Sequence, residues 1–327
     1  GSSAGSTATA QGGTNPMGPA ATGGSTSGNM GGSAPGGGAP NAGGPNAGTI
    51  TTTGGSGTGG AQGSNNPSDP YAGSDASATI PTPDASQPVA GNYWQPAAGL
   101  TWQWQLSESV TQILPVDVYD IDWESDAASV AALHAQGIKV ICYVSVGSWE
   151  DYRPDAADFP AAVIGNDYVG WPGEKHVDIR ASALRNIMLA RFDVCQQKGF
   201  DAIEPDNMDV FELGTDSGFP LTEQDGIDYA LWMADQAHAR GLGIGQKNAA
   251  SITAQIQGQY QWALTESCYS DGNWCGDVSA YADANKPVFM CEYEAASFND
   301  ACAAWQGNQY SPILKGMDLD APITFCP

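Results

Sequence analysis

Basic residues are scarce in this chain, with 11 Lys and Arg against 36 Asp and Glu and a formal net charge of −25. So acidic a protein repels nucleic acid and anionic membrane surfaces, and we exclude both as partners. The three histidines are scattered, at positions 134, 176 and 238, and no Cys-x-x-Cys pair accompanies them. We therefore expect no metal site and no cofactor. No apolar run reaches the length of a membrane span, so we expect no transmembrane segment.

Aromatic and charged residues are also nearly absent from residues 1–90, where Tyr71, Asp69, Asp75 and Asp84 are the exceptions. This stretch is mostly Gly, Ser, Ala, Thr, Asn and Pro, and it cannot bury enough apolar surface to offset the entropy of ordering. We predict a disordered low-complexity linker over 1–90. A Gly-rich structured repeat is the alternative, but no strict period supports it. Residues 91–327 are rich in Trp, Tyr and aliphatic side chains, and their length is typical of a single (β/α)8 TIM barrel domain.

The first residues, Gly-Ser-Ser-Ala-Gly-Ser, include no initiator Met and continue as a linker. Such a start is expected of a processed chain that is secreted or tethered to the cell surface, including a former lipoprotein. An artificial N-terminal addition explains it equally well. The high negative charge suits solubility outside the cell, and we expect a monomer.

All seven cysteines lie after residue 91. Cys268 and Cys275 bracket a short polar and aromatic loop, which predicts a disulfide in an oxidising compartment. A second predicted disulfide, between Cys302 and Cys326, would hold the C-terminal tail. Cys142 and Cys291 lie within apolar strand patterns and are predicted to be buried thiols. The odd number of cysteines leaves at least one thiol free.

Short apolar strands alternate with amphipathic helices from residue 101 onward, which is the pattern of repeated βα units around a parallel sheet. The expected barrel strands cover 101–106, 116–122, 139–146, 176–179, 200–206, 243–248, 262–266 and 287–293. A further apolar segment at 311–317 is either an extra strand or moves this count by one. Helices are expected over 127–136, 182–198 and 222–240, each followed by a glycine at its C-terminus. The third begins with Thr222 and Asp225, which resemble a capping box.

Polar residues gather at the C-terminal ends of the predicted strands, where barrel enzymes place their catalytic groups. Asp206 follows Pro205, which cannot donate to a strand ladder, so we expect Asp206 at the rim. Glu266 ends the strand that leads into the Cys268 loop. Two carboxylates at one barrel mouth are what cleavage of a glycosidic bond requires. The other candidate site residues are Asp120, Asp122, Tyr143, Ser145, Trp149, Asp178, Glu204, Asn207, Lys247, Asn248, Glu292 and Tyr293.

Each acid in this set has an alternative role in a cap or an ion pair, and we expect part of the set to play it. Lys247 would keep neighbouring carboxylates ionised, or it would tie adjacent strands through an ordinary salt bridge. Aromatic side chains at loop positions are candidate stacking platforms for sugar rings. They are Trp104, Trp123, Tyr143, Trp149, Trp171, Tyr269, Trp274 and Tyr293.

A collinear series of motifs between residues 100 and 325 resembles glycoside hydrolase family 114. In the first half the motifs are Val118-Tyr119-Asp120-Ile121-Asp122, Tyr143-Val144-Ser145-Val146-Gly147-Ser148-Trp149-Glu150, Arg153-Pro154-Asp155, Trp171-Pro172-Gly173-Glu174 and Asp178-Ile179-Arg180. In the second half they are Ile203-Glu204-Pro205-Asp206-Asn207, Lys247-Asn248, Glu266-Ser267-Cys268, Lys286-Pro287-Val288-Phe289 and Glu292-Tyr293. The set is more specific than any one of its members.

The resemblance implies a TIM barrel that acts as an endo-α-1,4-polygalactosaminidase on a cationic, partly deacetylated galactosamine-rich exopolysaccharide. It implies Asp206 as the nucleophile and Glu266 as the general acid/base, with retention at the anomeric carbon. A free 2-amino sugar has no acetamido carbonyl to act as an internal nucleophile, so the protein must supply its own. An acidic mouth would also attract the protonated amines.

Three other functions stay open at this point. The first is a non-catalytic carbohydrate-binding barrel, which the retained acid pair disfavours. The second is a glycosidase of the same mechanism that acts on another α-galactoside or amino-sugar polymer; the acidic surface argues against a neutral substrate. The third is an adhesin whose barrel only supports the long N-terminal segment. Substitution of Asp206 and Glu266 separates catalysis from binding.

Overall fold

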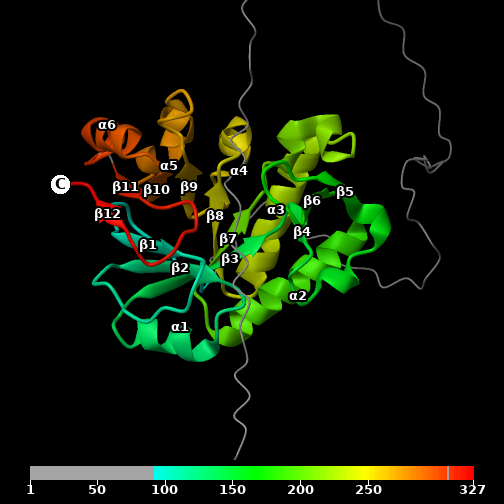
Figure 1. The fold of residues 1–327 in the computed structure, drawn as a ribbon, viewed down its shortest axis with the longest axis horizontal. Helices are drawn as coiled ribbons and strands as arrows, with labels where there is room; N and C mark the ends of the chain where they lie inside the picture. Colours follow the sequence, from blue (N-terminus) through cyan, green and yellow to red (C-terminus); the bar gives the residue numbers. More distant parts are fainter. Residues whose placement is uncertain (1–91, 308) are drawn as a thin grey trace, which may run out of the picture. The chain divides into compact units, whose positions relative to one another are not determined.

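The computed structural model describes residues 92–307 and 309–327, so the predicted linker and its boundary at residue 90 lie outside the described residues. Within this part, nine strands form one curled sheet in the order β1-β2-β3-β7-β8-β9-β10-β11-β12 (Figure 1). The strands are β1 (Trp102–Gln105), β2 (Val118–Asp122), β3 (Lys139–Ser145), β7 (Ala202–Asp206), β8 (Gly243–Lys247), β9 (Trp262–Glu266), β10 (Val288–Glu292), β11 (Tyr310–Leu314) and β12 (Thr324–Phe325).

Each of the first eight strands in this order is parallel to its neighbours, and β12 pairs with β11 in the antiparallel direction. Side chains join β1 to β11, the two outer members of the parallel series. The indole of Trp102 donates to the Ser311 carbonyl at 2.8 Å, and the Ser311 hydroxyl donates to the Leu100 carbonyl at 2.7 Å. The predicted (β/α)8 barrel is therefore confirmed.

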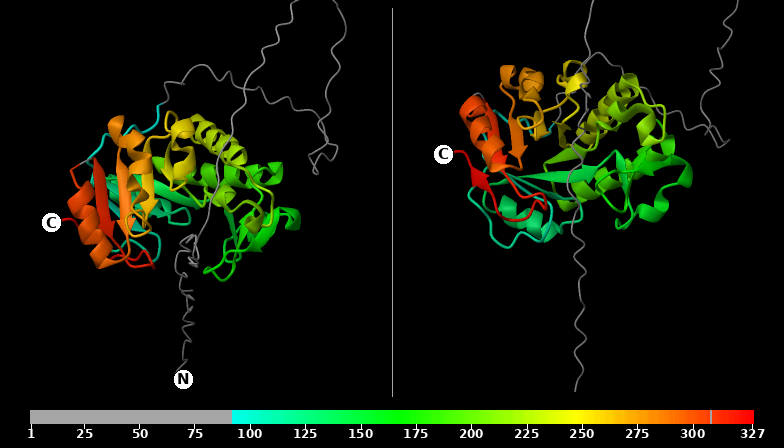
Figure 2. Two further views of the ribbon diagram at one scale, coloured as in Figure 1. Left: turned by 90° about the horizontal axis from the view of Figure 1, so that it is seen from above. Right: turned by 45° about the horizontal axis from the view of Figure 1, so that its top comes forward.

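The prediction of a barrel strand at 176–179 is wrong. The segment forms β6 (Glu174–Val177), which pairs antiparallel with β4 (Ser148–Glu150) and β5 (Ile164–Asp167) in a separate small sheet. This sheet, green in Figure 2, lies between β3 and α2 in the chain. A barrel strand is buried on both faces and is mostly apolar, whereas β6 carries Glu174, Lys175 and His176. The eighth barrel strand is β11 instead. It corresponds to the apolar segment at 311–317, which the sequence left as either an extra strand or a shift in the count.

Helices cover the outside of the barrel. Those at 127–136, 182–198 and 222–240 were predicted from the sequence, and the helix at 295–305 was not. The helices are α1 (Ala127–His134), α2 (Ser182–Lys198), α3 (Glu223–Ala239), α4 (Thr253–Ile256), α5 (Ser279–Asp283) and α6 (Ala295–Trp305). Gly199 ends α2 with a φ of 89°, in the left-handed region that glycine adopts without strain. The capping box of α3 is confirmed, since Thr222 and Asp225 bond to each other's backbone N–H at 3.2 and 2.8 Å. None of the helices in the described residues combines the length and apolarity needed to cross a bilayer.

Alternate positions of the barrel strands fill its interior with large apolar side chains. Trp102, Trp262 and Phe289 belong to this inner cluster, while a second cluster lies between the sheet and the helices. Gly245 of β8 makes room for the neighbouring indole, because a Cβ at this position would lie 2.1 Å from Trp262 Nε1. Large aromatic side chains therefore pack the barrel interior, and the residues at its C-terminal mouth rest on this packed base.

All seven cysteines fall within the described residues. They form disulfides Cys142–Cys195, Cys268–Cys275 and Cys302–Cys326, and Cys291 is a buried free thiol. The predictions for the last two pairs and for Cys291 are confirmed. The prediction of a buried thiol at Cys142 is wrong, because Cys142 lies in the cluster between sheet and helices, where Cys195 of α2 meets it. Cys291 lies in the inner cluster, out of reach of the helices.

Candidate active site

Lys247, the last residue of β8, places its ammonium among three carboxylates. Its Nζ lies 2.6 Å from Asp206 Oδ1, 2.9 Å from Glu266 Oε2 and 3.0 Å from Glu204 Oε1. The strands β7, β8 and β9 are neighbours in the barrel, so their C-terminal ends bring these side chains together. Because both oxygens contact one nitrogen, Asp206 Oδ1 and Glu266 Oε2 are separated by at most the sum of 2.6 and 2.9 Å, about 5.5 Å.

The ammonium of Lys247 is held in place from below as well. Its side chain is 1 % exposed, and Nζ lies 4.7 Å from the centroid of the Trp104 ring. Burial alone would lower the pKa of Lys247, but the charges of Asp206, Glu204 and Glu266 outweigh it and raise that pKa well above its ordinary value. Lys247 is therefore a permanent cation at the barrel mouth.

Asp206 accepts hydrogen bonds on both carboxylate oxygens. Lys247 occupies Oδ1, while the hydroxyl of Tyr143 and the amide of Asn207 donate to Oδ2 at 2.7 and 3.2 Å. Burial and then the charge of Asp206 raise the pKa of Tyr143 well above its ordinary value, so this hydroxyl stays a donor. Three donors thus fix the direction of the Asp206 carboxylate.

Glu266 is held by a similar set of neighbours, which directly follow β8 and β10 in the chain. The hydroxyl of Tyr293 donates to Glu266 Oε1, and the backbone N–H of Glu266 donates to Asn248 Oδ1 at 3.0 Å. Burial and then the charge of Glu266 raise the pKa of Tyr293 well above its usual range. Both predicted catalytic carboxylates therefore share Lys247 and each receives a tyrosine hydroxyl.

The backbone turns sharply just after each of these three strands. Asn207, Asn248 and Ser267, which follow Asp206, Lys247 and Glu266, have φ values of 61°, 46° and 52°. Such left-handed backbone is unusual outside glycine and is concentrated at functional sites. Gly147 allows the first of these turns, because a Cβ there would lie 1.9 Å from the Asn207 carbonyl oxygen.

A second pair of acids, Asp120 and Glu204, lies beneath this layer. Asp120 is fully buried, and its oxygens meet no donor among the described residues, so its approach to the Glu204 carboxyl group is favourable only when one of the two acids carries a proton. Burial and then the charge of Glu204 raise the pKa of Asp120 well above its usual range. Burial also raises the pKa of Glu204, to about 7, although Lys247 acts in the opposite direction. A shared proton between the two acids satisfies this geometry, and Glu204 then supports Lys247.

Four predicted site residues lie farther from the ammonium of Lys247. Ser145 accepts a hydrogen bond of 3.0 Å from Asn207 and so stands one contact behind Asp206. Asp122 forms an ion pair with Arg153 at 2.9 Å, and Asp178 forms one with Arg180 at 2.8 Å. The indole of Trp149 donates to the Ala156 carbonyl in the small sheet region. A substrate-binding role for these residues stays a prediction.

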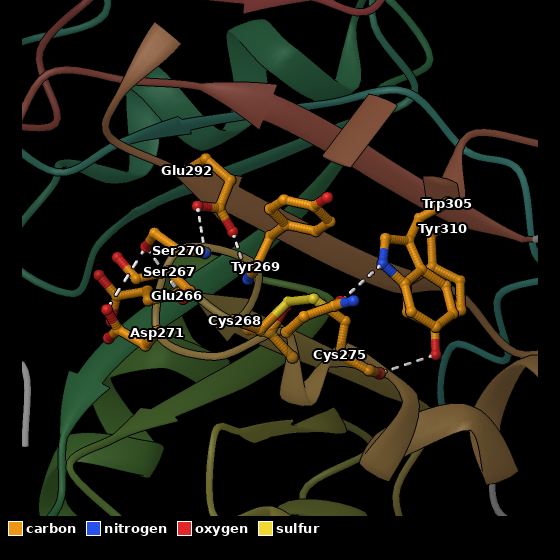
Figure 3. Close-up of a disulfide and its surroundings, with 12 residues drawn as sticks. Glu266, Ser267, Cys268, Tyr269, Ser270, Asp271, Cys275, Glu292, Trp305 and Tyr310 are labelled. Carbon is orange, nitrogen blue, oxygen red and sulfur yellow. Dashed lines mark hydrogen bonds between the residues drawn. A yellow bond between two sulfur atoms is a disulfide. The ribbon is translucent and has the colours of Figure 1, made fainter. Parts of the chain in front are cut away.

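Glu292 binds the backbone of the loop that follows Glu266 (Figure 3). Its carboxylate accepts hydrogen bonds from the backbone N–H groups of Tyr269 and Ser270 at 2.8 and 3.3 Å. Burial raises the pKa of Glu292, while these two hydrogen bonds lower it. Glu292 and the Cys268–Cys275 disulfide together fix the loop that follows Glu266.

Sequence reasoning missed Tyr168 and misplaced Trp104. The hydroxyl of Tyr168 donates to Asn207 Oδ1 at 2.9 Å, which connects the small sheet to the residue next to Asp206. Tyr168 directly follows β5, a strand that the sequence did not predict, so no local signal placed it near the mouth. Trp104 was a candidate stacking platform, but it is 1 % exposed and donates instead to Glu204 Oε2 at 3.0 Å.

A parallel (β/α)8 barrel with paired carboxylates at its C-terminal mouth defines a glycoside hydrolase. The model of glycoside-hydrolase family GH114 matches residues 83–327, and the chain belongs to this family. The chain is similar to Aspergillus fumigatus Ega3, whose crystal structure was determined in complex with galactosamine. The two sequences are 36 % identical, the TM-score is 0.66, and the match covers 72 % of this chain and 100 % of that one.

The glycoside hydrolase domain of PelA from Pseudomonas aeruginosa is also similar, with 16 % identity and a TM-score of 0.56 over 69 % of this chain and 99 % of that one. At this level of identity, the likeness to PelA concerns the fold alone. A comparison with curated proteins gave no match.

Proposed function

We propose that this barrel cleaves within chains of α-1,4-linked, galactosamine-containing polysaccharide with retention at the anomeric carbon. The observation that carries the proposal is the Lys247 ammonium between Asp206 and Glu266, which limits their facing oxygens to a separation of about 5.5 Å. Retaining glycosidases hold their two carboxyl groups about 5–5.5 Å apart, while inverting enzymes need about 6.5–9.5 Å to admit a water.

The roles of the two carboxylates are those that the family resemblance implies, and their neighbours suit these roles. Asp206, held by three donors, attacks the anomeric carbon, and a covalent glycosyl-enzyme forms as the glycosidic bond breaks. Glu266 gives a proton to the leaving oxygen and then takes one from the water that releases the sugar. Lys247 holds Asp206 as the attacking carboxylate and offsets the negative charge that Glu266 gains when it gives up its proton. Tyr143, Asn207, Asn248 and Tyr293 position them and line the sugar-binding mouth.

The substrate class rests on the likeness to Ega3, whose structure contains galactosamine, and on the charge of this chain. Protonated amines along a deacetylated polymer would be drawn to a protein of net charge −25. The free amine also leaves the sugar without an internal nucleophile, which suits a protein that supplies its own carboxylate. A cationic, partly deacetylated polymer fits both features.

We further propose that residues 91–327 form the catalytic domain of a monomer that acts outside the cell, free or tethered to the surface. The family match, which begins at residue 83, supports the domain boundary. Three disulfides among the described residues support an oxidising compartment.

The decisive experiment measures the release of oligosaccharides from purified, partly deacetylated galactosaminogalactan. Wild type should release them, while Asp206→Asn and Glu266→Gln should each lower the rate by about 10³-fold. Asp235→Asn and Glu223→Gln, which change exposed acids on α3, serve as matched controls and should keep the wild-type rate. Circular dichroism of all five proteins checks that they fold.

Two results would contradict the proposal. Binding of the polymer without release of products by the wild type would leave a carbohydrate-binding barrel in its place. Release of products at similar rates by the wild type and both site variants would remove Asp206 and Glu266 from the mechanism. Retention is checked separately, since nuclear magnetic resonance of the first product should show the α-anomer.

A further inference from the structure

The small sheet carries a pocket of about 480 Å³ that the proposed chemistry does not use. Trp149 of β4 and the turn between β5 and β6 line it, and Tyr168 and Trp171 belong to that turn. The Tyr168 hydroxyl reaches Asn207 at 2.9 Å, and the Asn207 amide reaches Asp206 at 3.2 Å. Two hydrogen bonds therefore separate the wall of this pocket from the proposed nucleophile.

The aromatic walls of the pocket are fixed in place by their own polar atoms. Trp149 Nε1 donates to the Ala156 carbonyl at 3.0 Å, and the Tyr168 hydroxyl is bonded to Asn207. Trp171 closes the turn, since its backbone N–H donates to the Tyr168 carbonyl at 3.0 Å and its carbonyl accepts from Glu174 at 3.1 Å. With the polar atoms of Trp149 and Tyr168 already paired, the half-buried rings present apolar surface, as suits the face of a sugar ring.

The free charge of the pocket is negative. Asp151 is exposed and forms no ion pair within the described part of the chain, while Lys175 is paired with Asp167 on the adjacent strand. Gly173, with a φ of 94°, leaves the space that Asp151 uses, because a Cβ there would lie 2.7 Å from Asp151 Oδ1. Among the described residues that line the pocket, Lys175 is the only cation and is already neutralised, so Asp151 is left to meet a positive ligand.

We propose that this pocket is a distal subsite that binds one protonated amino-sugar unit of the polymer, with the sugar face on the aromatic walls and its ammonium on Asp151. The inference rests on the proposed function, since it assigns a second contact to the same substrate. The enzyme then selects deacetylated units away from the cleaved bond as well as beside it. An acetylated unit can still stack on the rings, but it brings no charge to Asp151.

The test compares two ligands and measures binding in the Asp206→Asn background, which prevents turnover. The ligands are a fully deacetylated α-1,4-galactosamine hexamer and its fully N-acetylated counterpart, titrated by calorimetry at low salt. Asp151→Asn should raise the Kd of the deacetylated hexamer about fivefold and leave the acetylated one unchanged. Trp171→Ala should raise both about tenfold. Asp235→Asn, an exposed acid outside the pocket, should change neither.

The proposed subsite is refuted if Asp151→Asn changes the Kd of both hexamers equally or of neither. It is also refuted if Trp171→Ala leaves both Kd values unchanged. Asp151 is exposed and its replacement is isosteric, so this variant tests the proposal even if Trp171→Ala disturbs the turn. Failure of the proposed function looks different, because the wild-type protein would then cut no polymer. If the Asp206→Asn protein bound neither hexamer while the wild type cut the polymer, the subsite proposal alone would fall.

Discussion

The protein contains two buried clusters of charged residues. Each combines basic with acidic side chains, but the two differ in composition. The mouth cluster consists of Lys247 with Asp120, Glu204, Asp206 and Glu266. The Arg153 cluster, under the small sheet, consists of Arg153 and Arg191 with Asp122, Glu150 and Asp155. One cation faces four acids in the first, whereas in the second two cations face these three acids and the more exposed Glu124.

The two clusters also differ in how fully their cations occupy the carboxylate oxygens. Arg191 binds Asp155 with two parallel hydrogen bonds of 2.8 and 2.9 Å, and Arg153 reaches Glu150 at 3.0 Å. Forked guanidinium contacts use up the carboxylate oxygens that they meet. At the mouth, a single ammonium is divided among three carboxylates, and Asp206 and Glu266 remain 16 % and 17 % exposed. Asp206 and Glu266 are therefore close, restrained and still open to a substrate, while the Arg153 cluster is suited to hold the small sheet in place.

The largest effect that separates the clusters should come from Lys247→Met. Without the ammonium, Asp206 and Glu266 repel each other and lose the contact that sets their spacing, so kcat/KM on the polymer should fall about 10³-fold. The three carboxylates can take up protons in its place, which limits the loss of unfolding free energy. Steady-state kinetics and urea denaturation measure the two quantities. Retention of activity within tenfold of wild type would show that the Lys247 bridge is merely structural.

Arg153→Met should give the opposite pattern. It leaves Asp122 buried without its cation and Glu150 with only Arg191, at 3.7 Å, so the free energy of unfolding should fall by about 3–5 kcal/mol. The folded fraction should keep kcat/KM within about tenfold of wild type. Arg240→Met is the matched control, because Arg240 pairs with the half-exposed Asp193 at 2.7 Å and its loss should cost less than about 1 kcal/mol. Equal losses from the two arginine variants would mean that burial adds nothing to the Arg153 cluster.

The mouth cluster could be predicted from the sequence far better than the Arg153 cluster. The ends of β7, β8 and β9 follow from period-two alternation and from Pro205, and these local signals placed Asp206, Lys247 and Glu266 at one edge. Parallel pairing then brings such ends together without any further information. The family resemblance supplied their roles, which the residues alone did not.

The small sheet could not be predicted because its strands are short and pair over long distances in the chain. β4 has three residues, and its partner β6 begins only at Glu174. The predicted segment, 176–179, left out Glu174 and Lys175, the charged residues that set this run apart from a barrel strand, and the count of eight was then reached with the wrong member. The error also hid Tyr168 and the partners of Asp122 and Asp178. In the same way, a disulfide from Cys142 depends on which face of β3 meets α2, and that requires the three-dimensional packing.

The smallest expected effect concerns the proton of Asp120 in the mouth cluster. In the folded protein the pKa of Asp120 lies well above its usual range, so the folded state keeps a proton that the unfolded chain has lost. The folded state binds more protons, and the unfolding free energy therefore falls as pH rises from about 4, by up to about 1.4 kcal/mol per pH unit for one group. Glu204 and Glu174, with pKa values raised to about 7 and about 8, act in the same direction.

Asp120→Asn removes this titration while keeping a donor for Glu204, so it should be within about 1 kcal/mol of wild type at pH 5. Between pH 5 and 8 the difference in unfolding free energy should move steadily in favour of the variant, because only the wild type still has to hold a proton on residue 120. Glu204 and Glu174 should leave part of the fall in both proteins. Urea denaturation at pH 5, 6.5 and 8, with Asp235→Asn as the control, measures the difference. A difference that stays constant or moves against the variant would mean that Asp120 is ionised in the fold, and the mouth cluster would then depend on Lys247 alone.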